Sequence, residues 1–210
     1  SNKANNILVL APHTDDGELG CGGTIAKYIE NGDTVFYVAF SSCQDSIPEG
    51  YPKDVLKHEL KNAMDVLGVK RENSRILDYP VRRFGEFRQN ILDDMIKLER
   101  ELHPKCVLST SPRDIHQDHY VIAKEAMRAF KKTTLFAYEV PWNNFEFHNQ
   151  AFVTLEKRHI EKKVRAIACY DTQKNRPYTA SDFTFGQARL HGAQIGREYA
   201  EVYEVIRWVE

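Results

Sequence analysis

Hydrophobic runs alternate with amphipathic stretches along most of the chain. Residues 7–11 are apolar throughout, which is typical of a central parallel strand buried on both faces. Similar apolar and β-branched runs predict strands at 6–11, 34–40, 75–78, 106–109, 134–140, 151–155 and 202–209. We expect 151–155 to be an extra, antiparallel strand, and 202–209, where polar and apolar residues alternate, to be an edge strand.

Between these runs, apolar residues recur at helical spacing. In one stretch Leu56, Leu60 and Leu67 fall on a single stripe, and Gly68 provides a natural stop. The same reasoning predicts helices over 19–30, 54–67, 87–102, 118–130 and 157–170, and over the second half of 183–199.

Strands that alternate with helices indicate an α/β protein with a parallel sheet, helices on both faces and right-handed crossovers. We therefore predict one domain over 1–210 with a Rossmann-like parallel sheet flanked by helices. The pattern becomes less regular after Val140. The C-terminal portion is thus expected to cover the active face rather than extend the sheet.

Composition and charge narrow the class of protein. The 210 residues suffice for one sizeable core, and the formal net charge of −1 gives no general attraction to nucleic acid or membrane. No apolar run approaches the roughly 20 residues that cross a bilayer, and residues 1–6 lack the apolar core of a signal peptide. The four cysteines are scattered, without a CxxC pair. We expect free thiols in a cytoplasmic protein.

Two loops that follow predicted strands are rich in residues that can bind metal. The first loop offers His13, Asp15 and Asp16, and the second offers Asp114, His116, Asp118 and His119. Both loops leave the same edge of a parallel sheet, so they can meet in space. Two histidines and a carboxylate with one open position form a catalytic zinc pattern. Adjacent aspartates point in different directions, so one can bind the metal while the other faces the bound water.

The two loops also carry a family resemblance. Segment 13–24 (HTDDGELGCGGT) resembles the signature of the zinc-dependent de-N-acetylases typified by the LmbE-like proteins and the GlcNAc-phosphatidylinositol de-N-acetylase. Segment 112–119 (PRDIHQDH) is similar to the second motif of that family. Weaker similarities at 59–69, 170–173 and 199–201 extend the resemblance over the whole chain.

The resemblance implies a role for each loop residue. His13, Asp16 and His119 would hold Zn²⁺, and Asp15 would be the general base on the metal-bound water. His116 would protonate the leaving amine or stabilise the oxyanion, and Asp118, or else Asp114, would orient a histidine. The implied reaction removes the N-acetyl group from a small-molecule amino sugar or its conjugate. Family analogy also suggests a homo-oligomer.

Three positions depart from the family pattern: Thr14 stands where proline is commonest, Gly17 where many members carry glutamate, and the third bears on the substrate. Leu56 stands where a substrate-contacting arginine is expected. Arg82 and Arg83 are our candidates to replace it in substrate binding, with Lys53 and Lys57 as further options. The loops at 141–148 and 175–182 are expected to determine the substrate.

Other functions are also compatible with parts of the pattern. The chain could be an amidase that acts on another N-acyl bond, for example that of a thiol conjugate. It could also be a non-catalytic sugar- or nucleotide-binding module with a vestigial metal site. The glycines at 20, 22 and 23 do not match G-x-G-x-x-G, which argues against a dinucleotide site.

Overall fold

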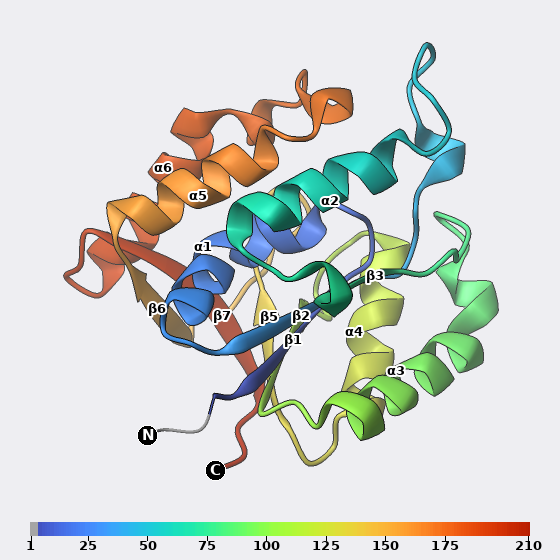
Figure 1. Cartoon of the computed structure of the whole chain (residues 1–210). Helices are drawn as coiled ribbons and strands as arrows, with labels where there is room; N and C mark the ends of the chain where they lie inside the picture. Colours follow the sequence, from blue (N-terminus) through green and yellow to red (C-terminus); the bar gives the residue numbers. More distant parts are fainter. Residues whose placement is uncertain (1–3) are drawn as a thin grey trace.

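A computed structural model describes residues 4–210 and contains one seven-stranded sheet, in the order β3-β2-β1-β4-β5-β7-β6 (Figure 1). The first five strands pair in parallel, whereas β7 is antiparallel to both of its neighbours. The strands are β1 (Asn6–Ala11), β2 (Thr34–Ala39), β3 (Ser74–Ile76), β4 (Cys106–Thr110), β5 (Thr134–Tyr138), β6 (Ala151–Leu155) and β7 (Tyr199–Arg207). The prediction of an α/β protein with a largely parallel sheet is confirmed.

Helices cover both faces of the sheet (Figure 1). One face carries α3 (Arg88–Leu102) and α4 (Gln117–Ala129). The other carries α1 (Asp16–Glu30), α2 (Val55–Leu67) and α5 (Lys157–Ile167), while α6 (Ser181–Gln194) packs against α5 and β7. Single 3₁₀ turns lie at Gln44–Ser46, Arg71–Asn73, Phe84–Phe87, Asp171–Gln173 and Pro177–Thr179.

The β1 strand shows why its sequence is continuously apolar. Ile7 and Val9 belong to the hydrophobic core under α1 and α2, and Leu8 and Leu10 belong to the core under α3 and α4. Successive side chains of a strand point to opposite faces, so a strand covered on both sides needs apolar residues at every position.

The C-terminal portion differs from the prediction in its sheet topology. The predicted edge strand is wrong, because β7 lies between β5 and β6, and the portion after Val140 therefore adds two strands to the sheet. The first residues of β7, from Tyr199 to Glu204, are all buried. The antiparallel direction predicted for 151–155 is confirmed. Helix α6 begins at Ser181, earlier than expected.

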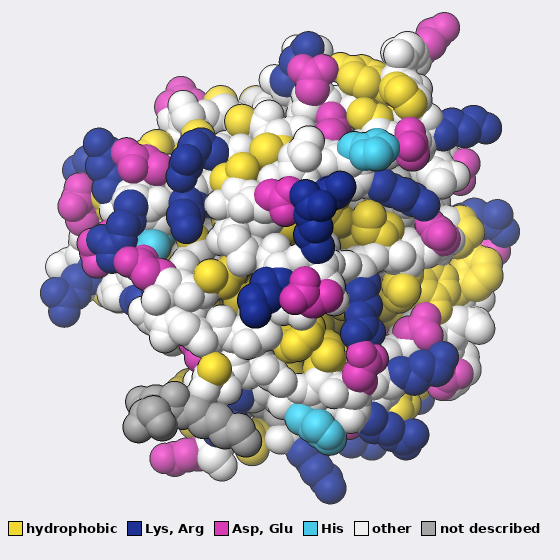
Figure 2. All heavy atoms as spheres, viewed as in Figure 1, with side chains coloured by type: hydrophobic (Ala, Val, Ile, Leu, Met, Phe, Trp, Pro, Cys, Tyr) yellow, Lys and Arg dark blue, Asp and Glu magenta, His cyan; other side chains and the backbone are white. Residues whose placement is uncertain are grey.

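The expectations drawn from composition can also be compared with the structure. All four cysteines are free thiols, as expected. On the face seen in Figure 2, basic and acidic side chains are interspersed, in keeping with the net charge of −1.

Within residues 4–210, no helix combines the length and apolarity that a membrane span requires. The proposed lack of a signal peptide concerns residues 1–6, of which 1–3 lie outside the described part.

Candidate metal centre and active site

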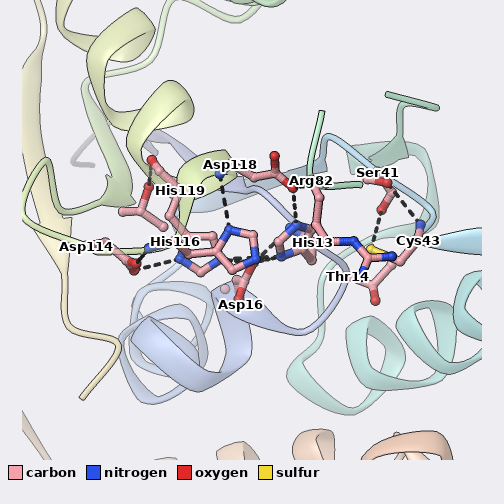
Figure 3. Close-up of polar contacts among 12 residues, drawn as sticks. His13, Thr14, Asp16, Ser41, Cys43, Arg82, Asp114, His116, Asp118 and His119 are labelled. Carbon is pink, nitrogen blue, oxygen red and sulfur yellow. Dashed lines mark hydrogen bonds and ion pairs between the residues drawn. The ribbon is translucent and has the colours of Figure 1, made fainter. Parts of the chain in front are cut away.

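Sheet pairing brings the two predicted loops together. Strands β1 and β4 are parallel neighbours, with Val9 opposite Leu108. Their carboxyl ends therefore lie side by side, and the loop before α1 faces the loop before α4. Figure 3 shows the side chains of both loops converging on one point.

Three side-chain atoms form the centre of this cluster. The Asp16 Oδ2 atom lies 3.2 Å from His13 Nδ1 and 3.1 Å from His119 Nε2. The two imidazole nitrogens are 3.3 Å apart. Residues more than 100 positions apart in the sequence thus present three potential metal ligands to one point.

A carboxylate supports each of the two imidazoles from behind. The other ring nitrogen of His13, Nε2, lies 2.9 Å from Asp118 Oδ2, and His119 Nδ1 lies 2.7 Å from Asp114 Oδ2. Both aspartate side chains are fully buried. A carboxylate behind a metal-binding histidine fixes its tautomer and ring orientation. From the sequence, Asp118 and Asp114 were alternatives for orienting a histidine, and in the structure each lies behind one of the two imidazoles.

His116 occupies a different position at the same centre. One ring nitrogen from each of His13, His116 and His119 lies within 4.8 Å of the other two. However, His116 caps α4, and its Nδ1 accepts a hydrogen bond of 3.1 Å from the Asp118 backbone N–H. Because Nδ1 is an acceptor, we assign the proton of the neutral ring to Nε2.

Burial and neighbouring charges set the ionisation of the cluster. Burial disfavours charge on His13 and His119, but adjacent carboxylates, Asp16 foremost, raise the pKa of His13 to about 9 and that of His119 to about 10. Burial likewise opposes charge on Asp16, yet the two imidazoles hold its pKa well below the usual range. Burial and then the Asp16 charge raise the pKa of Asp15 to about 6, and burial lowers the pKa of His116.

The cluster lines a pocket of about 340 Å³, a volume at the small end of the range for ligand sites. Asp15 and Leu56 line it, and so does Arg82, one of the predicted substrate-binding residues. Arg83, the other, pairs with Glu86 and is among the residues that line a neighbouring pocket.

Several pocket residues were not predicted individually. The loops at 141–148 and 175–182 were expected to determine the substrate, and they contribute Trp142, Arg176 and Tyr178, while Gln173 comes from the preceding turn. The Trp142 and Tyr178 rings are stacked, with their centroids 3.8 Å apart and an interplanar angle of 10°. No periodic signal marks these residues, because loop residues are placed by tertiary contacts.

A buried polar network holds the β1–α1 loop in place. The Tyr37 and Tyr170 hydroxyl oxygens lie 2.9 and 2.8 Å from the Thr14 carbonyl oxygen. Both hydroxyls also bind the Glu18 carboxyl, whose pKa burial raises to about 8. Glu18 is fully buried and, through these two tyrosines, holds the β1–α1 loop in place.

Strand β7 carries two buried glutamates that were not predicted from the sequence, one bound to helix α1 and the other to the β4–α4 loop. Helix α1 bends at Cys21, and Glu201 accepts hydrogen bonds from the freed N–H groups of Gly23 and Thr24 while it pairs with Lys163 at 2.8 Å.

Glu204 contacts the β4–α4 loop. It accepts hydrogen bonds from Ser111 Oγ at 2.6 Å and from Arg113 at 3.1 Å. Ser111 and Arg113 lie within three residues before Asp114, so this contact fixes the start of the β4–α4 loop.

Comparison with known proteins agrees with this architecture. The chain is 25% identical over 173 residues to YaiS of Escherichia coli K12, an uncharacterized deacetylase, with 80% of this chain and 91% of that protein covered. It is 28% identical over 129 residues to diacetylchitobiose deacetylase of Thermococcus kodakarensis, which covers 56% of this chain and 46% of that enzyme.

Two solved structures are similar over nearly the whole chain. The conserved protein TT1542 of Thermus thermophilus superimposes with a TM-score of 0.82 at 25% identity, over 98% of this chain and 96% of that one. The 4-carboxy-2-hydroxymuconate hydratase GalB of Pseudomonas putida KT2440 superimposes with a TM-score of 0.79 at 21% identity, over 98% of both chains. A hydratase on this fold means that the fold by itself does not determine the reaction. Residues 8–130 match the GlcNAc-PI de-N-acetylase (PIG-L) family, to which this chain therefore belongs.

Proposed function

We propose that the chain is a zinc-dependent hydrolase that removes the N-acetyl group from an amino sugar or a sugar conjugate. His13, Asp16 and His119 would hold the ion. The observation that carries the proposal is the convergence of His13 Nδ1, Asp16 Oδ2 and His119 Nε2 at separations of 3.1 to 3.3 Å.

The donor set fits zinc. Ligands bound tetrahedrally to zinc at about 2.0–2.1 Å lie about 3.3 Å from one another, and the three atoms already have this spacing. Each imidazole directs one nitrogen to the centre and has a carboxylate behind the other. The pocket beside them leaves one side of the centre open, as a catalytic site requires.

A rival ligand set would use His116 in place of Asp16. The hydrogen bond from the Asp118 N–H to His116 Nδ1 argues against it, because it leaves the neutral ring with its proton on Nε2. With Nδ1 already an acceptor, metal binding at Nε2 would require the neutral His116 ring to lose its remaining proton, whereas that N–H can donate a hydrogen bond. We therefore assign His116 to the reacting group and Asp16 to the ion.

The residues around the centre supply acid and base chemistry. When bound, zinc would polarise the amide carbonyl and lower the pKa of water from about 15.7 to about 7. Asp15 lines the pocket beside the centre and would take the proton of the attacking water. His116 would donate from Nε2 to the oxyanion or to the departing amine nitrogen. A positioned acid or base of this kind contributes about 10²–10⁴-fold to the rate.

Two observations support an amino-sugar substrate. The family to which the chain belongs is described as acting on GlcNAc-PI. In addition, the stacked rings of Trp142 and Tyr178 give the pocket an aromatic wall. An amide of a thiol conjugate is the alternative within the same chemistry.

Acetate release from a panel of N-acetylated sugars, with a thiol-conjugate amide included, tests the proposal. We expect release from an acetylated amino sugar that chelators abolish and zinc restores. Asp15→Asn should retain zinc and lose at least about 10²-fold in kcat, whereas His13→Ala should lose zinc. An Asp15→Asn enzyme with parental turnover would contradict the assignment of the base. Zinc-loaded protein that cleaves only the thiol-conjugate amide would exclude the sugar substrate.

A further inference from the structure

Glu59 is a buried acid on α2 that the proposed mechanism does not use. It is 5% exposed and follows Leu56, which lines the pocket, by one helical turn. Within residues 4–210 its carboxylate forms hydrogen bonds to one residue, Thr172. Oε1 accepts from the Thr172 backbone N–H at 3.0 Å, and Oε2 accepts from Thr172 Oγ1 at 2.7 Å. Burial of a charged group is costly unless it is paired or hydrogen-bonded, and both Glu59 oxygens find their donors on Thr172.

The Thr172 hydroxyl passes this constraint on to Gln173. Thr172 Oγ1 lies 3.2 Å from Gln173 Nε2. An ionised carboxylate can only accept a hydrogen bond, so the hydroxyl proton of Thr172 points to Glu59. Thr172 Oγ1 then offers only lone pairs to Gln173, and the Gln173 amide must turn an N–H group toward it. The orientation of a glutamine amide follows from its hydrogen bonds, so Glu59 sets the orientation of Gln173 through Thr172.

The backbone of Gln173 is held in place as well. Its N–H donates to the Tyr170 carbonyl oxygen at 2.9 Å, and its carbonyl oxygen accepts from the Arg176 N–H at 2.9 Å. The Tyr170 hydroxyl oxygen in turn lies 2.8 Å from the carbonyl oxygen of Thr14, in the loop that carries the proposed metal ligands. The turn that contains Gln173 is therefore fixed both to α2 and to the β1–α1 loop.

The amide oxygen of Gln173 is left available to a ligand. Gln173 lines the same pocket as Asp15 and His116. Its side chain makes one hydrogen bond within the described part of the chain, the one from Nε2 to Thr172, so Oε1 has no donor there. An amide oxygen accepts up to two hydrogen bonds. An amino sugar carries several hydroxyl groups, and each of them can donate to such an oxygen.

We propose that Gln173 Oε1 accepts a hydrogen bond from a hydroxyl group of the substrate sugar, and that Glu59 and Thr172 are positioning residues that keep this oxygen free for the substrate. This inference rests on the proposed function and deepens it, because it adds a specificity determinant away from the reacting acetamide. A site that binds a hydroxyl group in this way discriminates against an analogue that lacks it, since the acceptor is then left unpaired.

Deoxy analogues of N-acetylglucosamine test the inference on the zinc-loaded enzyme. The 3-, 4- and 6-deoxy compounds each lack one hydroxyl group, and we expect at least one of them to lose about tenfold or more in kcat/KM, mainly through KM. Gln173→Met keeps a side chain of similar length without the amide. It should cleave that analogue and N-acetylglucosamine with kcat/KM values within about twofold of each other. A parent enzyme that does not discriminate, or a Gln173→Met variant that discriminates as the parent does, would overturn the inference while the deacetylase activity stands.

Conservative substitutions test the two positioning residues. Thr172→Val removes the hydroxyl group that holds the Gln173 amide, and Thr172→Ser is the matched control that keeps it. Glu59→Gln places an N–H donor opposite Thr172 Oγ1, so the hydroxyl proton can point to Gln173 and draw Oε1 away from the substrate. We expect Thr172→Val and Glu59→Gln to lose the discrimination against the deoxy analogue with parental zinc content, and Thr172→Ser to retain it.

The half-buried Thr172 gives a test that does not depend on the folding of Glu59→Gln. If Thr172→Val discriminates as the parent does, or if Thr172→Ser loses the discrimination to the same extent as Thr172→Val, the positioning roles are refuted.

A binding measurement separates this inference from the proposed function. If N-acetylglucosamine releases no acetate, calorimetry still compares its affinity with those of the three deoxy analogues. Weaker binding of one analogue, with a difference that disappears in Gln173→Met, would support the hydroxyl contact although the deacetylase proposal fails. Equal binding of the four sugars, no binding of any of them, or a difference that Gln173→Met retains would refute the contact.

Discussion

Replacement of Asp118 by asparagine isolates the role of the carboxylate behind His13. Three N–H groups point at the buried Asp118 carboxylate: the His13 ring at 2.9 Å, Arg82 at 2.6 Å and Phe84 at 3.2 Å. Together they outweigh burial and hold the pKa of Asp118 below its usual range. An asparagine has one oxygen, so its amide N–H group must face at least one of these donors.

The structure sets the size of the expected effect. A buried donor left without an acceptor costs about 1–3 kcal/mol, so we expect Asp118→Asn to lower the free energy of unfolding by that amount. Loss of a carboxylate behind a metal-binding histidine typically weakens metal affinity 10–100-fold. This corresponds to about 1.4–2.8 kcal/mol in zinc binding.

Competition with a chelator of known affinity measures the zinc affinity, and urea titration measures stability. Asp94→Asn is the matched control, because Asp94 accepts a hydrogen bond from Tyr79 away from the centre. That variant should retain parental zinc affinity. If Asp118→Asn binds zinc within twofold of the parent while His13→Ala does not bind it, our account of His13 orientation is wrong.

Two further predictions concern stability. A Cβ at Gly20 would lie 2.1 Å from the buried Tyr138 ring, so Gly20→Ala should cost at least about 1–3 kcal/mol in urea titration. Gly186→Ala within α6 meets nothing within 4 Å and should instead stabilise by up to about 1 kcal/mol; equal effects would refute the packing argument. Burial opposes charge on His191, but its 2.7 Å hydrogen bond to Glu139 raises its pKa above the ordinary 6.5. The charged His191–Glu139 pair therefore stabilises the fold fully below pH 6.5, and this contribution is lost as pH rises through the folded-state pKa. The stability difference between the parent and His191→Gln should therefore be larger at pH 6 than at alkaline pH, and a difference that grows with pH would contradict the pairing.

The sequence predicted the first two-thirds of the fold well because local pattern and burial agree there. Strand β1 is found at its predicted residues, and α2 and α3 differ from prediction by one residue at their starts. The helix over 19–30 was predicted too short, since α1 already begins at Asp16. Its first turn contains polar residues and glycines, which hide the helical period.

Strand β7 shows where sequence reasoning failed. Its alternation of glutamates with apolar residues resembles that of a half-exposed strand, yet Glu201 and Glu204 are buried. Their partners, Lys163 and Ser111 among them, lie 38 and 93 residues away in the sequence. A charged residue can be buried when it is paired, but no local pattern reveals a partner so distant.

The candidate site divides along similar lines. The two loops and their seven acidic and imidazole side chains were named from the sequence because strand ends in a parallel sheet lie at one edge. The structure then distinguished the supporting aspartates, Asp118 behind His13 and Asp114 behind His119. Arg176 was not identified, since its place in the pocket depends on the path of a long loop.

A crystal structure of the zinc-loaded chain, with anomalous diffraction recorded at the zinc edge, tests the central claim most directly. We predict one anomalous peak, bound by His13 Nδ1, Asp16 Oδ2 and His119 Nε2, with His116 unligated and Asp15 beside the open side of the ion. A peak bound by His116 in place of Asp16, or no peak at this centre in zinc-saturated crystals, would contradict the account.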